Sequence, residues 1–464
     1  MTDDRAVRFS TLVYVVSAIA ATGGLLFGFD TGVISGALLF LKKEFALDST
    51  SQEFVVSAVL VGAVIGSAAS GRVTDLFGGK LVIFCTAVIF AAGTLITALA
   101  PSMHVVIAGR IVLGIAIGIA SYAVPLYISE TSPAQIRGAL VSLNQLMITI
   151  GILVSYLVDS LFAATQYTWR GMFAVGLVPS IILGVGLVFL PASPRWLMAR
   201  KREDDARDVL KRLVPAREID AQMDEMRVSI AGESVSGGWR DLGQRWIRPA
   251  FFMGIAIMFF QQATGINTII YYAPTIFQMA GFGSETAAIG ATVAVGAVNV
   301  IMTIVSLFLI DRWGRRPLLL AGLVGMVASL VIVGVAFSFG ESLGEGLKWA
   351  AVAGIFVYIA AFAIGLGPIA WLLISEIYPL GIRGLAMSLS TVANWVFNFF
   401  IALTFLSLIE TLGRPVTFFC FAAVGIVGWF YCYFMIPETK GCSLESIEAD
   451  MRALKPSRRW GKRG

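Results

Sequence analysis

The chain has 464 residues, of which 58% are hydrophobic and only 14% are charged, whereas a soluble globular domain has about 25% charged residues. This composition excludes an ordinary water-soluble protein. The net charge of +5 would suit a nucleic-acid partner, but the placement of the basic residues has a different explanation, given below.

Twelve apolar stretches, each long enough to cross a hydrocarbon core of about 30 Å, follow one another along the chain. The polar start, residues 1–8, and the length of the first stretch indicate a retained first helix rather than a cleaved signal peptide. We therefore predict an all-α integral membrane protein with transmembrane helices over residues 10–40, 53–73, 81–100, 104–128, 139–162, 170–191, 249–280, 287–310, 317–339, 347–374, 385–408 and 415–436.

The basic residues favour one side of the membrane. Arg110 alone lies within a span. If both termini are cytoplasmic, the basic residues left outside are Lys42, Lys43, Arg170, Lys348 and Arg414, and all the others lie inside. This is the positive-inside rule, so we predict a multi-pass protein of the inner (plasma) membrane with cytoplasmic termini and no nucleic-acid partner.

A repeat divides the chain into two halves. Residues 128–138 and 374–384 share Ile, Ser, Glu, Pro, Ile, Arg and Gly at an offset of 246, and Pro191 and Pro437 begin matching segments at the same offset. Six spans separate the copies, which predicts a pseudo-two-fold axis along the membrane normal with a substrate site between the halves. We predict a six-helix bundle over 1–192, a short helical cytoplasmic linker over 193–248, a second six-helix bundle over 249–437 and a cytoplasmic tail over 438–464.

Asp30 is the outstanding charged residue within the spans. An ionised side chain near the bilayer centre costs about 2.5–3.5 kcal/mol, and Arg110 is the only intramembrane cation that could offset this cost. Either Asp30 takes up and releases a proton, with Arg110 stabilising its charge in one state, or the two form a permanent pair that fixes helix register. We favour proton exchange, because an Asn would fix register at a lower cost.

Uncharged polar and aromatic side chains form a second signal. Amides both donate and accept hydrogen bonds, which suits a neutral ligand covered in hydroxyls, although each alone is equally compatible with interhelical hydrogen bonding. Gly265 would let the seventh helix break and free backbone groups for a site. The set comprises Gln145, Gln261, Gln262, Asn267, Tyr271, Tyr272, Asn299, Trp371, Asn394, Trp395 and Asn398. Neither the four cysteines nor the single histidine has metal-ligand spacing, so no cofactor is expected.

Together these motifs resemble the sugar porter family of the major facilitator superfamily over essentially the whole chain. The resemblance is carried by residues 110–114, 125–130, 137–138, 145, 261–267, 311–316, 367–371 and 437–441. It implies the major facilitator fold and a transporter rather than an enzyme. It also implies a hexose site lined by Gln145, Gln261, Gln262, Asn267, Asn299, Trp371 and Asn394, with Phe27 and Tyr271 nearby.

Charged residues at equivalent cytoplasmic helix ends suggest a gate, in which ion pairs rearrange as the halves move. The alternative is that positive charge there only maintains topology. The gating candidates are Asp75, Glu130, Arg137, Asp311, Arg315, Glu376 and Arg383. Gly79 and Ala192 depart from the family pattern, which has Arg and Glu at these positions.

At the position of Asp30, bacterial galactose and xylose proton symporters are similar to this chain, whereas animal facilitative glucose carriers have a neutral amide. Ile152 stands where the xylose carrier has Gln. We therefore expect a proton-coupled symporter that imports a hexose, glucose or galactose, by alternating access and functions as a monomer. Two alternatives remain: the same fold carrying a pentose or polyol such as xylose or inositol, and a membrane sugar sensor that does not transport.

Overall fold

The structure is a computed structural model that describes residues 10–133, 135–233, 240–442 and 444–461. In these residues, twelve helical spans are long and apolar enough to cross a membrane, as predicted. The expected retained start, residues 1–8, lies outside the described residues. The first six spans are α1 (Thr11–Glu44), α2 (Ser49–Phe77), α3 (Gly79–Ala98), α4 (Met103–Thr131), α5 (Arg137–Phe162) and α6 with α7 (Thr168–Ala174, Leu177–Phe189). The second six are α11 with α12 (Arg248–Ala263, Ile266–Met279), α13 (Glu285–Trp313), α14 (Arg315–Phe339), α15 with α16 (Glu345–Ile364, Leu366–Ile377), α17 (Arg383–Leu412) and α18 (Arg414–Met435).

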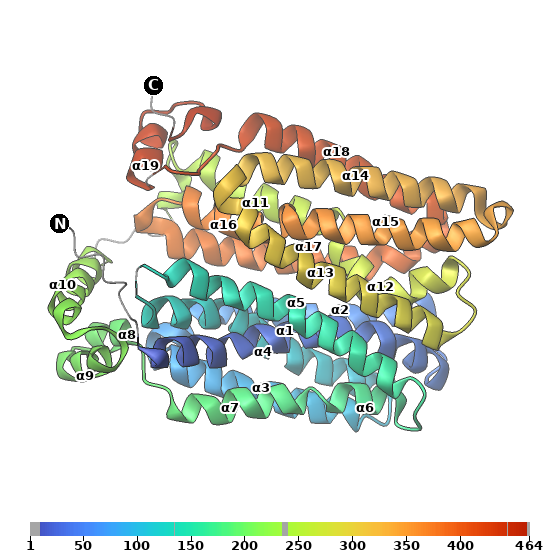
Figure 1. Cartoon of the computed structure of the whole chain (residues 1–464), viewed down its shortest axis with the longest axis horizontal. Helices are drawn as coiled ribbons and strands as arrows, with labels where there is room; N and C mark the ends of the chain where they lie inside the picture. The colour runs from blue at the N-terminus through green and yellow to red at the C-terminus, as the bar shows by residue number, and fades with distance from the viewer. Residues whose placement is uncertain (1–9, 134, 234–239, 443, 462–464) are drawn as a thin grey trace, which may run out of the picture.

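The helices fall into two groups, which we call the first half (α1–α7) and the second half (α11–α18) (Figure 1). In the first half, α2 and α3 pack on α4, and α1 packs on α5; in the second, α14 packs on α15 and α18, and α11 packs on α17. Two extensive contacts join the halves, α2 with α17 and α5 with α13. These are the second span with the eleventh and the fifth with the eighth. A shift of six spans exchanges the two pairs, as a pseudo-two-fold axis requires.

The repeat in the sequence corresponds to a repeat in local geometry. Ile136 and Ile382 precede α5 and α17 with nearly equal backbone angles, φ −120° and ψ 2° against φ −123° and ψ 1°. Gly78 and Gly314 end α2 and α13 at φ 84° and 90°, a region that favours glycine. Both halves therefore use the same turns at the same places.

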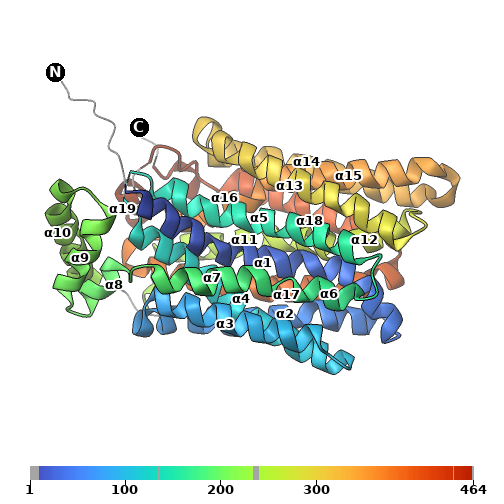
Figure 2. The ribbon, with the colours of Figure 1, turned by 60° about the horizontal axis from the view of Figure 1, so that its bottom comes forward.

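A group of short helices lies at one end of the bundle (Figures 1 and 2). It comprises α8 (Pro194–Ala199), α9 (Glu203–Leu213), α10 (Ala216–Glu233) and, after the last span, α19 (Leu444–Arg452). The helical linker expected over 193–248 contains several short helices, and α9 and α10 are separate because Val214 before Pro215 is extended, as residues preceding proline usually are. We call this the linker end and the opposite one the far end. The 3-10 helices are η1 (Asp241–Gly243), η2 (Gly340–Leu343), η3 (Leu380–Ile382) and η4 (Ser457–Arg459).

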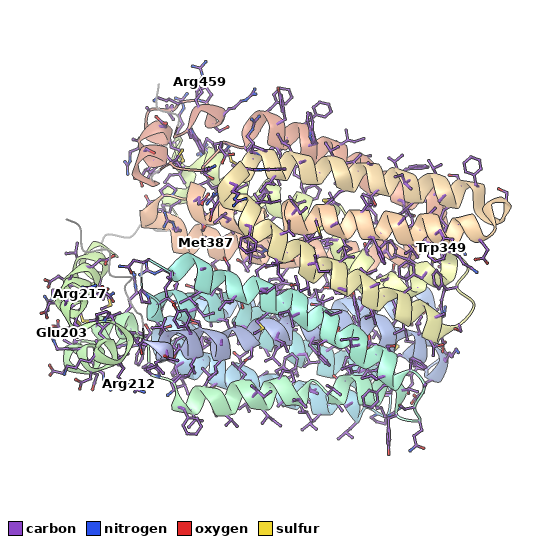
Figure 3. All side chains as sticks on the ribbon, in the orientation of Figure 1. Glu203, Arg212, Arg217, Trp349, Met387 and Arg459 are labelled. Carbon is purple, nitrogen blue, oxygen red and sulfur yellow. The ribbon has the colours of Figure 1, made fainter. Side chains whose placement is uncertain are left out.

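The two ends differ in their side chains (Figure 3). Glu203, Arg212, Arg217 and Arg459 lie at the linker end, whereas Trp349 marks the far end. Between them, exposed apolar side chains such as Phe189, Phe308 and Val427 cover the flanks of the bundle. An apolar belt with charged residues beyond it is typical of a protein that spans a bilayer.

Candidate functional site

The structure brings Asp30 and Arg110 together between α1 and α4. Arg110 Nη1 lies 3.6 Å from Asp30 Oδ1, and the side chains are 0% and 2% exposed, respectively. The helix α1 continues to Glu44, beyond the predicted end at residue 40. Asp30 is therefore fourteen residues, or about 21 Å at 1.5 Å per residue, from the far end of its helix. The pair is isolated from water deep inside the first half.

Arg110 has further partners on neighbouring helices. Its Nη2 lies 3.5 Å from the main-chain oxygen of Val56 in α2, and its guanidinium carbon lies 5.9 Å from the centre of the Phe173 ring in α6. Within the described residues, Asp30 Oδ2 and Arg110 Nε have no hydrogen-bond partner. The pair thus retains unused hydrogen-bonding capacity, which is unusual for buried polar atoms and would accommodate a proton on Asp30.

Four amide side chains of the second half form a connected group, which we call the amide cluster. Asn267 Nδ2 donates to Gln262 Oε1 at 2.8 Å, and Gln262 Nε2 donates to Asn394 Oδ1 at 3.2 Å. Asn394 Nδ2 in turn donates to Gln261 Oε1 at 2.7 Å. The members come from α11, α12 and α17, so three helices converge on one neutral polar site.

The amide cluster lies where two broken spans meet. The seventh span breaks at Gly265 (φ 91°), as expected, and the tenth breaks at Gly365, which the sequence pattern did not predict. Gln261 Nε2 donates to the main-chain oxygens of Leu366 and Gly367, both at 3.1 Å. Tyr358 satisfies the oxygen of Thr264 at the end of α11. Side chains thus donate hydrogen bonds to main-chain oxygens that the helix breaks leave without a partner in the helix.

Aromatic rings connect this site to the first half. The Phe27 ring of α1 lies 5.2 Å from the Trp395 ring of α17. Asn398 Nδ2 donates to Tyr271 Oη at 3.3 Å. Within the described residues, the buried atoms Trp395 Nε1 and Asn398 Oδ1 have no partner. One donor and one acceptor are therefore available to ligand hydroxyls. Both residues belong to the polar set that the sequence singled out, although the hexose site implied by the family resemblance includes neither.

Three expected site residues are not joined to the amide cluster. Gln145 on α5 and Trp371 on α16 are half-buried, and Asn299 on α13 is buried. None of the three makes a hydrogen bond in the part of the chain that the structure describes. The polar groups of these three side chains are therefore able to bind a ligand in this conformation.

The gating candidates all lie at the linker end, and in the second half they form a network. Arg315 Nη2 lies 2.9 Å from Glu376 Oε1, and Arg315 Nη1 lies 3.4 Å from Asp311 Oδ1. The carboxylate of Glu438 accepts the main-chain N–H groups of Arg315 and Arg316, each at 3.0 Å. Glu438 was not among the expected residues, although the 437–441 motif contains it.

In the first half, Gly79 and Ala192 stand at the positions equivalent to Arg315 and Glu438, so two charged members of the second-half network have no charged counterpart. The main-chain oxygen of Asp75 instead accepts hydrogen bonds from Trp196 Nε1 and Arg200 Nη2, both at 3.1 Å. Of the remaining candidates, Arg383 donates to the Tyr378 oxygen at 3.2 Å, Glu130 is half-buried and Arg137 is exposed.

Contacts between the halves concentrate toward the far end. Tyr156 Oη donates to the Ile270 oxygen at 3.1 Å, and Lys43 Nζ lies 2.6 Å from Glu285 Oε1. Toward the linker end, every residue of α5 from 141 to 148 is half-buried. No face of these two turns is fully packed, whereas Ile152, Ser155 and Tyr156 are buried. The structure is therefore closed at the far end and more open at the linker end.

Two buried carboxyl groups were missed by the sequence analysis. Asp159 in α5 is fully buried and accepts the Gly36 main-chain N–H at 3.1 Å. Glu53 in α2 is 2% exposed. Both lie near the ends of predicted spans, where a carboxylate is ordinarily solvated. Asp159 lies in an apolar stretch, the criterion that selected Asp30, so this signal could have identified it. Glu53 follows the polar residues 48–52 and carries no such signal.

Comparisons with known proteins agree with this architecture. A family described as sugar (and other) transporter matches residues 16–451. The chain belongs to the sugar transporter family. It is a multi-pass membrane transporter of the major facilitator fold, and the members of its family are transporters rather than enzymes.

The relatives of this chain are named for several different sugars. The chain is 40% identical to the galactose-proton symporter of Escherichia coli over 452 residues, covering 97% of each chain. It is 39% identical to the arabinose-proton symporter of the same species over 451 residues, covering 96% of this chain and 95% of that one. It also resembles the structure of the Escherichia coli xylose transporter XylE in a partially occluded inward-open conformation. The TM-score is 0.83 at 29% identity, covering 94% of this chain and 100% of XylE.

Proposed function

We propose that the protein is a proton-coupled symporter that imports a hexose, glucose or galactose, by alternating access. The observation that carries this proposal is the division of the buried polar groups. An ion pair able to exchange a proton lies in the first half, and a neutral amide cluster suited to hydroxyls lies in the second. Phe27 and Trp395 connect the two sites, so occupancy of one can influence the other.

Each site residue has a role in this proposal. Asp30 binds the transported proton, and Arg110 stabilises its carboxylate after the proton leaves. The amide cluster binds sugar hydroxyls, joined by Gln145, Asn299, Trp371 and Tyr271 when the halves close around the sugar. Phe27 covers an apolar face of the ring. The preference for a hexose rests on Ile152, which is 4% exposed and offers no hydrogen bond.

The proposed orientation places the linker end in the cytoplasm of a cell whose inner (plasma) membrane the protein spans. Both termini would then be cytoplasmic, and the basic residues of α8–α10 would obey the positive-inside rule. The two halves would move as units of a single monomer. The Arg315–Glu376 pair forms within the second half while the linker end is more open. Its members, with Asp75, Glu130, Arg137, Asp311 and Arg383, would exchange partners and hold the cytoplasmic side closed whenever the far end opens.

Counterflow in proteoliposomes tests this function directly. Vesicles preloaded with unlabelled glucose should accumulate labelled glucose transiently without any ion gradient, and an inward proton gradient should drive net accumulation. At 100 mV, one proton per sugar would sustain a gradient of about fiftyfold. Competition by galactose but not by xylose, arabinose or inositol is the expected pattern. Binding without counterflow would indicate a sensor, and stronger competition by pentoses would overturn the hexose assignment.

A further inference from the structure

A buried carboxyl group joins the two halves at the far end. Ser407 of α17 donates its main-chain N–H to Glu53 Oε1 at 2.8 Å, and its Oγ lies 2.6 Å from Glu53 Oε2. About one turn nearer the far end on both helices, the Ser49 hydroxyl bonds the Glu410 carboxylate. Glu53 is 2% exposed, whereas Glu410 is exposed. Both oxygens of Glu53 are thus engaged by a single residue of the opposite half.

In the part of the chain that the structure describes, Glu53 has no cationic partner. The groups that interact electrostatically with Glu53 are Glu410 on α17 and Tyr272 on α12. The helix α4, which packs on α2, carries Arg110 and, exposed at its far-end start, His104. Tyr272 Oη bonds the Ala402 oxygen and Arg110 pairs with Asp30. On the other two helices that contact α2, Lys43 of α1 pairs with Glu285, and Lys80 of α3 lies at the linker end.

The surroundings of Glu53 must change when the far end opens. Any movement that admits solvent between α2 and α17 has to separate Glu53 from Ser407 and expose the carboxyl group to water. Water stabilises the ionised form, whereas a dry site without a cation favours the neutral acid. The hydrogen-bond geometry also suits a neutral acid, because a carboxylic O–H can donate to Ser407 Oγ while the other oxygen accepts the N–H.

We propose that Glu53 is a second proton-binding site, which takes up a proton from the external solution as the far end closes and releases it there as the far end opens. The inference rests on the proposed alternating access but requires neither a particular sugar nor coupling through Asp30. An acidic exterior then favours the closed far end, so external protons promote the step that commits a loaded carrier to inward release.

Pulsed electron paramagnetic resonance on the full chain tests this inference. Spin labels at Thr165→Cys, in the loop between α5 and α6, and at Leu412→Cys, at the end of α17, report the separation of the halves at the far end. Both positions are exposed, and the four native cysteines are replaced beforehand. Distances are measured in proteoliposomes at pH 8 and pH 5.5 without sugar or gradient. Acidification should shift the distribution toward the shorter distance.

Glu53→Gln, which mimics the neutral acid, should hold the far end closed at both pH values. Glu410→Gln, the matched control on the same interface, should keep the pH response. Ser407→Ala removes one partner and should lower the closed-to-open ratio about two- to tenfold. A normal pH response in Glu53→Gln, or a far end that opens in this variant, would overturn the proposal, as would a Ser407→Ala variant with an unchanged ratio. Asp30→Asn should keep the response, so loss of coupling there is distinguishable from failure at Glu53.

Discussion

The first and fourth spans of the first half differ from their counterparts in the second half, the seventh and tenth spans. In the first half, the first and fourth spans are the continuous helices α1 and α4, which carry Asp30 and Arg110. Their counterparts, the seventh and tenth spans, break at Gly265 and Gly365 and carry amides and Trp371. A buried ion pair is stable only when its geometry is held closely, which continuous helices provide. A sugar site needs many adaptable donors and acceptors, which broken helices expose.

The largest expected effect comes from neutralising the ion pair of the first half. Asp30→Asn keeps size and polarity but cannot bind a transported proton, so uphill accumulation, about fiftyfold at 100 mV for one proton per sugar, should fall to equilibration. Counterflow should persist, because the amide cluster is untouched. Concentrative uptake and counterflow are measured in the same proteoliposomes. Wild-type accumulation in this variant would remove the proton role from Asp30.

The matching change in the second half should affect affinity rather than coupling. Gln262 hydrogen-bonds Asn267 and Asn394, and an amide bonded to a hydroxyl contributes about 0.5–1.5 kcal/mol. Gln262→Ala should therefore weaken hexose binding roughly two- to tenfold, with the accumulation ratio preserved at saturating sugar. Ile301→Ala, at a position of α13 that is 58% exposed, is the control. Equal affinities for both variants would make the amide cluster a helix-packing feature.

A smaller effect is expected from restoring the missing charges of the first half. A surface pocket of about 200 Å³ lies beside Gly79, Ala192 and Trp196, and the first turn of α3 lacks the capping carboxylate that Glu438 provides to α14. Ala192→Glu with Gly79→Arg should stabilise the closed linker end and lengthen the far-end distance between spin labels at Thr165→Cys and Leu412→Cys.

Ala192→Glu alone should raise the free energy of unfolding by about 0.5–2 kcal/mol by capping α3. The double variant should gain less, because the Cβ added by Gly79→Arg would lie 3.2 Å from Tyr127 Cβ. An unchanged distance together with an unchanged transport rate would exclude these positions from gating.

The smallest effect concerns the chain after the last span. Asp450 bonds Lys455 Nζ and the Gly461 main-chain N–H, and these two contacts lower the pKa of Asp450 below its usual 3.8. The stabilisation is therefore complete above pH 3.8 and is lost only as pH falls through the lowered pKa. Asp450→Asn should accelerate tryptic cleavage near Arg458 at neutral pH without changing transport. Cleavage of the wild type should be independent of pH between 6 and 8 once trypsin activity is normalised.

The sequence predicted the spans and the repeat because long apolar stretches and motifs at a fixed offset are local signals. It also predicted the break at Gly265, since one glycine sits beside polar residues. The break at Gly365 was missed although Gly367 and Pro368 follow it, because the apolar stretch around them is long enough for one uninterrupted span. Glu53 was missed for another reason: its partner, Ser407, is 354 positions away, and no local pattern reports such a contact.

Which of the predicted amides join the amide cluster also depends on contacts between residues far apart in the sequence. Gln261 was selected because of its motif, but its donation to Leu366 and Gly367 depends on how two broken spans meet. Gln145 and Asn299 were selected by the same rule as Gln262, yet they remain uncommitted in this conformation. Residue type predicts hydrogen-bonding capacity, whereas the conformational state decides which capacity is used.

The short helices at the linker end are divided between the halves, and this sets a mechanical limit. α8 packs on α4 and α9 contacts α1, whereas η1 contacts α11 and α19 contacts α16. Glu233 at the end of α10 and Arg240 before η1 are seven peptide units apart in the chain. Seven units stretch to at most about 25 Å. The covalent chain is therefore a tether of known maximum length, and it bounds how far the two attached groups can separate in any conformation that the transporter adopts.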